Sequence, residues 1–191
     1  MGLLIRPATS SDADALMSLR IEAEKWLAAA GIDQWRSPGF RERALAKWQV
    51  DIEEGRTWVV PGSDDMLLGT VTLARPDCDF WSEADAPSSA VYVAKLITSR
   101  AAAGHRLGGR LLDWAGGVAQ ARGLPWVRLD VWRTNKRLQQ YYLNEGFTHV
   151  RTEAPSHRLS GWMAQRLAST VMHPHDPLRA CSLADTPESS G

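Results

Sequence analysis

Two stretches within the first 55 residues place apolar side chains three or four positions apart, which is the spacing of an amphipathic helix. The first helix is expected over residues 12–30, capped by Ser10 or Ser11, and the second over residues 41–55. A short apolar segment at residues 3–8 predicts a strand ahead of both helices.

From residue 57 onward the apolar spacing changes to two, which is typical of strands. Residues 57–61 and 66–74 predict an antiparallel hairpin, and residues 90–98 are apolar enough for a central strand covered on both faces. The remaining pattern predicts, in order, a helix from residue 107 that ends at Gly123, a strand at 126–132, a helix at 135–145 and strands at 147–153 and 161–167. The element order is therefore βααβββαβαββ, a mixed α/β (α+β) domain over residues 1–170.

Residues 171–191 are rich in Pro, Ser and Asp and have no apolar periodicity, so we expect a mobile C-terminal tail. His173 and His175 lie in this tail, but two histidines without a third ligand do not predict a metal site. We therefore expect no resident metal.

Composition narrows the class of protein. The 22 Lys and Arg residues balance the 22 Asp and Glu residues, so no net positive field predicts a nucleic-acid partner. Charges at Arg6 and Asp12 argue against a signal peptide, and no apolar run is long enough to span a membrane. Cys78 and Cys181 form no paired motif, which argues against a disulfide framework or structural zinc. We expect a cytoplasmic protein.

The segment between the strand at 90–98 and the next helix carries Gly104, Gly108 and Gly109. Glycines there let the backbone N–H groups of a helix N-terminus approach phosphate oxygens. The charged side chains of His105, Arg106 and Arg110 could add to such an anion site. An ordinary strand-to-helix turn explains the same glycines. The segment contains neither GK[ST] nor G-x-G-x-x-G, which excludes a Walker loop and a dinucleotide fingerprint.

A second segment adds a polar residue and a tyrosine on one helix face. Asn135 begins the helix at 135–145, and Tyr142 lies seven residues later on the same side. Alone, Asn135 is explained as an N-cap and Tyr142 as a core aromatic. The neighbouring Tyr141 is a rival for any chemical role, although its side chain is expected to point about 100° away.

Together the two segments resemble the acetyl-CoA-binding motifs of the GCN5-related N-acetyltransferase (GNAT) family, whose element order is also the one predicted here. The pyrophosphate loop corresponds to Gly104, His105, Arg106, Leu107, Gly108 and Gly109. Tyr142 stands four residues before Gly146, at the usual position of the family tyrosine. This chain departs from the family pattern in two places, with Ala103 where Gln or Arg is usual and Arg106 where the first glycine is usual.

The resemblance implies a mixed, mostly antiparallel sheet whose fourth and fifth strands are parallel and splay apart, leaving room for acetyl-CoA. It further implies that the backbone of Leu96 and Thr98 binds the pantetheine arm and that an N–H near Leu96 or Ile97 stabilises the oxyanion. Tyr142 would protonate the departing thiolate, and Asn135 would hold acetyl-CoA or a water.

The expected partners are acetyl-CoA and an amine acceptor, handled by a monomer or homodimer. Residues that the family fold would bring near the acceptor are Glu24, Asp33, Glu153 and His157, with Trp26 and Trp35 as walls of its pocket. Two alternatives stay open: a noncatalytic acyl-CoA sensor, and a transferase acting on a protein N-terminus or an aminoacyl-tRNA.

Overall fold

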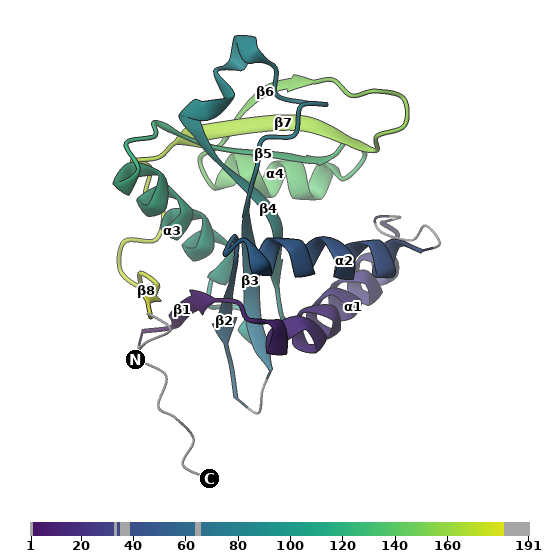
Figure 1. Cartoon of the computed structure of the whole chain (residues 1–191), viewed down its shortest axis with the longest axis vertical. Helices are drawn as coiled ribbons and strands as arrows, with labels where there is room; N and C mark the ends of the chain where they lie inside the picture. Colours follow the sequence, from purple (N-terminus) through teal and green to yellow (C-terminus); the bar gives the residue numbers. More distant parts are fainter. Residues whose placement is uncertain (1, 33, 35–38, 64–65, 182–191) are drawn as a thin grey trace.

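The computed structural model describes residues 2–32, 34, 39–63 and 66–181, and one mixed sheet of eight strands organises them (Figure 1). The strand order across the sheet is β6-β7-β5-β4-β3-β2-β1-β8. The strands are β1 (Leu4–Pro7), β2 (Thr57–Pro61), β3 (Leu67–Ala74), β4 (Ala90–Thr98), β5 (Trp126–Trp132), β6 (Thr148–Thr152), β7 (Ser160–Leu167) and β8 (Arg179–Ala180). Only β4–β5 and β1–β8 pair in parallel; the other pairs are antiparallel.

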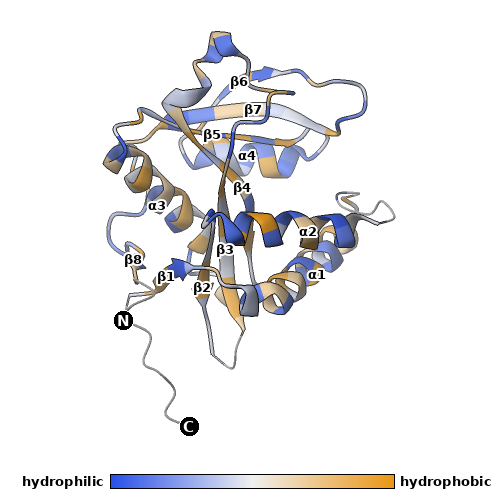
Figure 2. Cartoon of the chain, viewed as in Figure 1, coloured by the Kyte–Doolittle hydropathy of each residue, from blue (hydrophilic) through white to orange (hydrophobic). Residues whose placement is uncertain are grey.

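Helices cover both faces of this sheet. The helices are α1 (Ala13–Ala29), α2 (Phe40–Glu53), α3 (Leu107–Ala121) and α4 (Lys136–Asn144). Helices α1 and α2 bury Leu16 and Trp48 against one face, together with Val59 and Ile97 of the strands. Helix α3 and Tyr142 of α4 pack on the opposite face, in the larger apolar cluster. Figure 2 shows apolar residues along β2 and β3 and mixed polar and apolar stretches on α1 and α2, as two-sided burial of the sheet requires.

The expected order of helices and strands is confirmed, and the structure adds β8 and four short 3-10 helices among the described residues. The start of α1 differs in detail. Its first turn is a 3-10 helix over Ser10–Asp12, and the N–H of Thr9 donates to Oδ2 of Asp12 at 2.7 Å. The cap therefore lies at Thr9 rather than at Ser10 or Ser11.

Strands β4 and β5 separate soon after they begin. Their pairing runs only from Ala90 opposite Trp126 to Tyr92 opposite Arg128, although β4 continues to Thr98. On its other edge β4 contains a bulge, because its register with β3 shifts and Lys95 has a φ of 49°. The expected splay of the two parallel strands is present, and it opens a gap in the middle of the sheet.

The segment that we call the C-terminal strap, residues 171–181, lies along the domain. Its His173 N–H donates to Oδ2 of Asp113 at 2.7 Å, and Asp176 pairs with Arg110 at 2.8 Å. Strand β8 then pairs with β1. This differs from the expected mobile tail, because backbone hydrogen bonds and ion pairs fix a segment whose composition alone predicts none. Residues 182–191 lie outside the described part.

Within the described ranges, no helix is both long and apolar enough to cross a bilayer.

Candidate active site

A cleft of about 330 Å³ lies at the far end of the gap between β4 and β5, and we call it the strand-gap cleft. Its walls come from three regions: the end of β4, the α1 side of the domain, and the N-terminal parts of α3 and α4. Among the sequence-predicted residues, the lining includes Leu96, Ile97, Thr98, Gly108, Asn135, Tyr142 and Trp26. Residues as far apart in the sequence as Trp26 and Tyr142 therefore meet in one cleft.

The end of β4 offers free backbone groups to this cleft. The N–H of Ser99 bonds the carbonyl of Leu68 on β3 at 2.8 Å. Because backbone groups alternate along a strand, those of Leu96 and Thr98 point away from β3, toward the gap that β5 has left. An extended amide-containing chain can pair there as a further strand would.

The N-terminus of α3 closes one end of the cleft. Arg106 caps it in the left-handed conformation, with a φ of 49°, and its side chain is exposed. Gly104 has a φ of 84° and open space around it, and His105 is also exposed. In the part of the chain that the structure describes, no backbone carbonyl accepts from the N–H groups of residues 106–109. Such a row of unpaired donors, with the helix dipole behind it, suits a phosphate group.

Three residues near this loop point elsewhere. The Leu107 side chain is buried in the core. A Cβ on Gly109 would meet His173 and Glu145, so this glycine faces the C-terminal strap and not the cleft. The Arg110 side chain is buried and paired with Asp176, so it adds no charge to the anion site. For Leu107 and Gly109, only the backbone N–H remains as a binding group.

Cations that the loop pattern did not indicate line the cleft instead. Arg100 and Arg137 are exposed side chains of its wall. Arg137 lies over the Trp26 ring, 5.1 Å from the ring centroid. The backbone N–H of Arg100 also donates a hydrogen bond to Oε1 of Glu22 on α1, at 3.0 Å.

Asn135 is a buried N-cap that also connects two parts of the cleft. Its side-chain oxygen accepts from the N–H of Leu138 at 3.0 Å, which satisfies an orphan donor of α4. Its amide nitrogen donates to Oε1 of Gln34 at 2.9 Å. The N-cap explanation is therefore confirmed, and the side chain also holds Gln34 in the cleft wall, a residue that no sequence motif indicated.

Both tyrosines of α4 line the cleft, at different places. Tyr142 is buried, stacked edge-on against Phe147, and burial followed by the charge of Asp130 raises its pKa. Tyr141 is not turned away as expected: its hydroxyl lies where a Cβ on Gly108 would be, 2.5 Å from that position. Burial, with Glu145 adding to it, raises the pKa of Tyr141 as well. Tyr142 is thus near the strand gap, and Tyr141 is at the anion-binding end.

A second cavity, of about 510 Å³, opens on the α2 side of the sheet at the beginning of the gap. Val93 and Ala94 of β4 and Leu129 and Asp130 of β5 line it, immediately after the last paired residues of the two strands. Burial raises the pKa of Asp130 to about 6, with Ser160 acting in the opposite direction. Lys95 lines the second cavity and its neighbour Leu96 lines the strand-gap cleft, so the two cavities approach each other at the end of β4.

Of the residues nominated near the acceptor, those that the structure describes do not line either cavity, Trp26 excepted. Glu24 is buried, where it pairs with Arg20 and Arg41 at 2.8 and 2.9 Å, so it is part of an ion-pair network on α1. Glu153 and His157 are exposed at the β6–β7 side. Asp33 and Trp35 lie outside the described residues.

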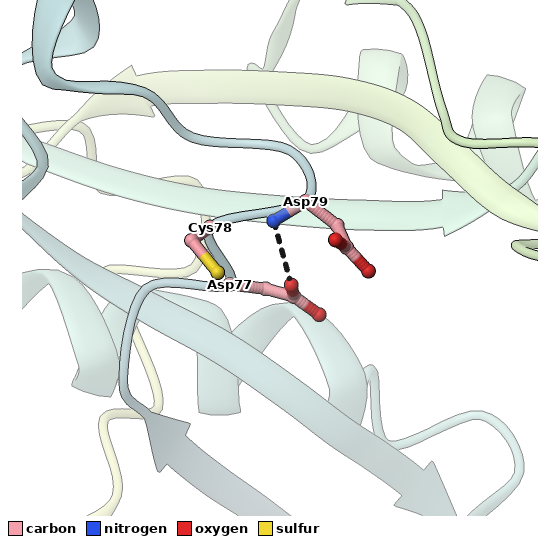
Figure 3. A group of neighbouring side chains, drawn as sticks. All are labelled: Asp77, Cys78 and Asp79. Atoms are coloured by element: carbon pink, nitrogen blue, oxygen red, sulfur yellow. Dashed lines mark hydrogen bonds between the residues drawn. The ribbon is translucent and has the colours of Figure 1, made fainter.

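The loop after β3 gathers Asp77, Cys78 and Asp79 (Figure 3), with the N–H of Asp79 donating to Oδ1 of Asp77 at 3.0 Å. Arg158 pairs with both carboxylates, at 2.6 Å for Asp77. These ion pairs balance the acidic charge and join the loop to the β6–β7 connection. Asp77 also lines the second cavity.

Comparison with known proteins places this geometry in a family. The model of the Acetyltransferase (GNAT) family matches residues 20–147. The chain is 26% identical over 161 residues to the N-acetyltransferase YesJ of Bacillus subtilis, covering 83% of this chain and 88% of YesJ. A GNAT-family acetyltransferase from Listeria monocytogenes superposes with a TM-score of 0.69 at 23% identity, covering 86% of this chain and 94% of that one. The PaiA N-acetyltransferase of Thermoplasma acidophilum, solved in complex with coenzyme A, gives 0.67 at 18% identity, with 87% and 99% covered.

Proposed function

The chain belongs to the acetyltransferase (GNAT) family, and from this premise we propose that it transfers an acetyl group from acetyl-CoA to a primary amine at the gap between β4 and β5. It is an acetyl-CoA-dependent N-acetyltransferase with the GNAT fold. The observation that carries the proposal is the pair of cavities, one at each end of that gap, which gives each reactant its own approach.

The strand-gap cleft fits acetyl-CoA. The N–H groups of residues 106–109 would bind the pyrophosphate, with Arg100 and Arg137 nearby as counter-charges. The outward backbone of Leu96 and Thr98 would bind the amides of the pantetheine arm. Acetyl-CoA supplies an activated thioester carbonyl, and a backbone N–H near Leu96 or Ile97 would stabilise the charge that develops on its oxygen.

The reaction has a simple proton balance. The amine nitrogen forms a bond to the acetyl carbon, the carbon–sulfur bond breaks, and one proton is released overall when an ammonium ion becomes an amide. Tyr142 would give its proton to the departing sulfur and regain one from solvent. A phenol is protonated at neutral pH at its ordinary pKa, as a donor requires, and the raised pKa of Tyr142 leaves that state unchanged. Asn135 would act by positioning, because its side chain already bonds Leu138 and Gln34.

A noncatalytic acyl-CoA sensor would need the strand-gap cleft alone. The second cavity, which reaches the same strand gap, favours an enzyme over a sensor. Transfer to a protein N-terminus or an aminoacyl-tRNA remains the alternative acceptor class, and we expect the reaction to take place in the cytoplasm.

The test is to incubate the protein with acetyl-CoA and a panel of small amines and peptides, following free CoA with a thiol-reactive dye and the acetylated product by mass spectrometry. Amine-dependent CoA release with a matching acetylated product supports the proposal. Acetyl-CoA binding without release for any amine would support the sensor instead.

A further inference from the structure

The charges around the second cavity are distributed unevenly. On the side of α2, β2 and β4, the cations Lys47, Arg56 and Lys95 lie about Asp51, and Arg56 also pairs with Glu54. Nε of Arg56 donates to Oδ1 of Asp51 at 3.0 Å, and Nζ of Lys95 pairs with its Oδ2. Arg75 lines the same wall and pairs with Glu54, so the four cations still outnumber these two carboxylates and the wall keeps an excess of positive charge.

Lys95 is held in an unusual way. It lies in the bulge of β4 with a φ of 49°, a conformation that a lysine adopts rarely, and the bulge directs its side chain to α2 over the Trp48 ring. Its side chain is 19% exposed. Burial lowers its pKa, Asp51 acts in the opposite direction, and Lys47 and Arg56 lower it to a smaller extent.

The β5 side of the cavity carries the opposite sign. Asp130 and Asp77 line it, and Asp77 already pairs with Arg158. Asp130 forms no ion pair with any cation in the ranges that the structure describes. It faces the cavity beside the strand gap, so a cationic group on an incoming molecule would be its counter-charge.

We propose that the second cavity binds an amine that also carries a carboxylate, with the ammonium group on Asp130 and the carboxylate on the cations around Lys95. The inference rests on the proposed function and names its acceptor class. Trp81, Tyr92 and Leu129 line the rest of the cavity and leave an apolar surface for a side chain. Asp130 accepts the first proton of the ammonium group, which frees the nitrogen lone pair beside the strand gap, and passes it to solvent.

Matched acceptors test this class. The acceptors are L-methionine, L-phenylalanine and 4-aminobutyrate, each compared with its own carboxamide, which keeps the amine and the size but removes the charge. We expect kcat/KM to be at least about tenfold higher for at least one acid than for its carboxamide, because a partly buried charge pair of this kind contributes about 1.4 kcal/mol.

Variants separate the two walls. Lys95→Gln and, in case that bulge variant does not fold, Lys47→Gln should lower kcat/KM for the acid and leave the carboxamide unchanged. Asp130→Asn should lower both, since both carry the amine. Lys25→Gln, an exposed lysine of α1 away from the cavity, is the charge-matched control and should change neither.

The outcomes are distinguishable. Carboxamides that react as well as the acids, or a Lys95 or Lys47 variant that affects both equally, would overturn the inference while acetyl transfer itself stands. Failure of every amine to release CoA would overturn the proposed function.

Discussion

Tyr142 and Tyr141 are adjacent residues with different surroundings in one cleft. Burial and the charge of Asp130 raise the pKa of Tyr142, whereas the hydroxyl of Tyr141 lies against Gly108 at the α3 end. We propose from this difference that the two tyrosines have different roles, Tyr142 with the departing sulfur and Tyr141 with the phosphate end of acetyl-CoA. The match of Tyr142 to the family tyrosine implied the first role, but the sequence could not show that Tyr141 also lines the cleft.

We expect Tyr142→Phe to lower kcat by about 10², the modest end of general-acid effects, because a thiolate leaving group only partly depends on a donor. The KM for acetyl-CoA should change little, since the ring remains. Tyr141→Phe is the matched variant: it should raise that KM and leave kcat nearly unchanged. Steady-state kinetics on both decide the assignment. The opposite pattern would exchange their roles, and full activity in both would mean that neither is the acid.

Asp130 should limit activity at low pH. Its pKa of about 6 means that the carboxylate loses its negative charge as the pH falls through 6, so kcat/KM should fall there. The groups that act on Asp130 are Asp77, which raises its pKa, and Arg158 and Ser160, which lower it. In Asp130→Asn this acidic limb should disappear from the pH profile. A limb of unchanged position in that variant would assign the titration to another group.

Asp130 should lower the free energy of unfolding above pH 6. The pKa of Asp130 is higher in the folded protein than the usual 3.8, so the folded state binds the proton more tightly, and its contribution to stability is lost as the pH rises from about 4 through 6. At pH 8 we expect Asp130→Asn to be more stable than the wild type by about 1–2 kcal/mol, and the difference should vanish below pH 4. Urea unfolding at the two pH values measures this. A variant less stable than the wild type at pH 8 would contradict it.

At the scale of elements, the N-terminus of α3 should decide acetyl-CoA binding. A Gly108→Asp side chain would put a carboxylate among the N–H groups of residues 106–109 and against the Tyr141 hydroxyl, so calorimetry should detect no binding. Gly117→Asp adds the same charge to an exposed position of the same helix, where nothing lies within 4 Å of a new Cβ, and should bind normally. Unchanged affinity in a folded Gly108→Asp protein would exclude this loop as the phosphate site.

The elements themselves could be predicted because their signals are local. Helical apolar spacing before residue 57 indicates α1 and α2, and strand spacing begins at residue 57 with β2 and β3. Glycines mark the ends of α3 and α4. The bulge at Lys95 has no such signal, since nothing in AVYVAKLIT distinguishes a lysine with positive φ from its neighbours. Asp130 was overlooked for a related reason. It lines a cavity only because β4 and β5 separate beside it, and the sequence does not show where that separation begins. Glu24 was expected near the acceptor, but Arg20 on α1 and Arg41 on α2 neutralise its charge, and the sequence does not show these pairs.

At the scale of the whole molecule, the C-terminal strap holds the sheet edge at β1 and the outer side of α3 together. Composition predicts a mobile tail over residues 171–191, since they are rich in Pro, Ser and Asp and have no apolar periodicity. Hydrogen bonds to β1 and the ion pair from Asp176 to the buried Arg110 supply the missing attachment. Those contacts depend on residues more than 60 positions away, which no local pattern reports.

Deletion of residues 171–191 should therefore lower the melting temperature. Loss of the Arg110 partner and of the β8 hydrogen bonds should cost about 2 kcal/mol, which corresponds to about 4–8 °C for a domain of this size. A chain that ends at Cys181 keeps these contacts and is the control. Differential scanning calorimetry compares the two. An unchanged melting temperature in the shorter chain would show that the strap does not stabilise the domain.

We propose that acetyl-CoA and the amine occupy separate cavities and react directly across the strand gap. Initial rates measured while both concentrations are varied test it most directly, because direct transfer requires both reactants on the enzyme at once. We expect double-reciprocal lines that intersect. Parallel lines, the pattern of a covalent acetyl-enzyme that forms and releases CoA before the amine binds, would contradict it.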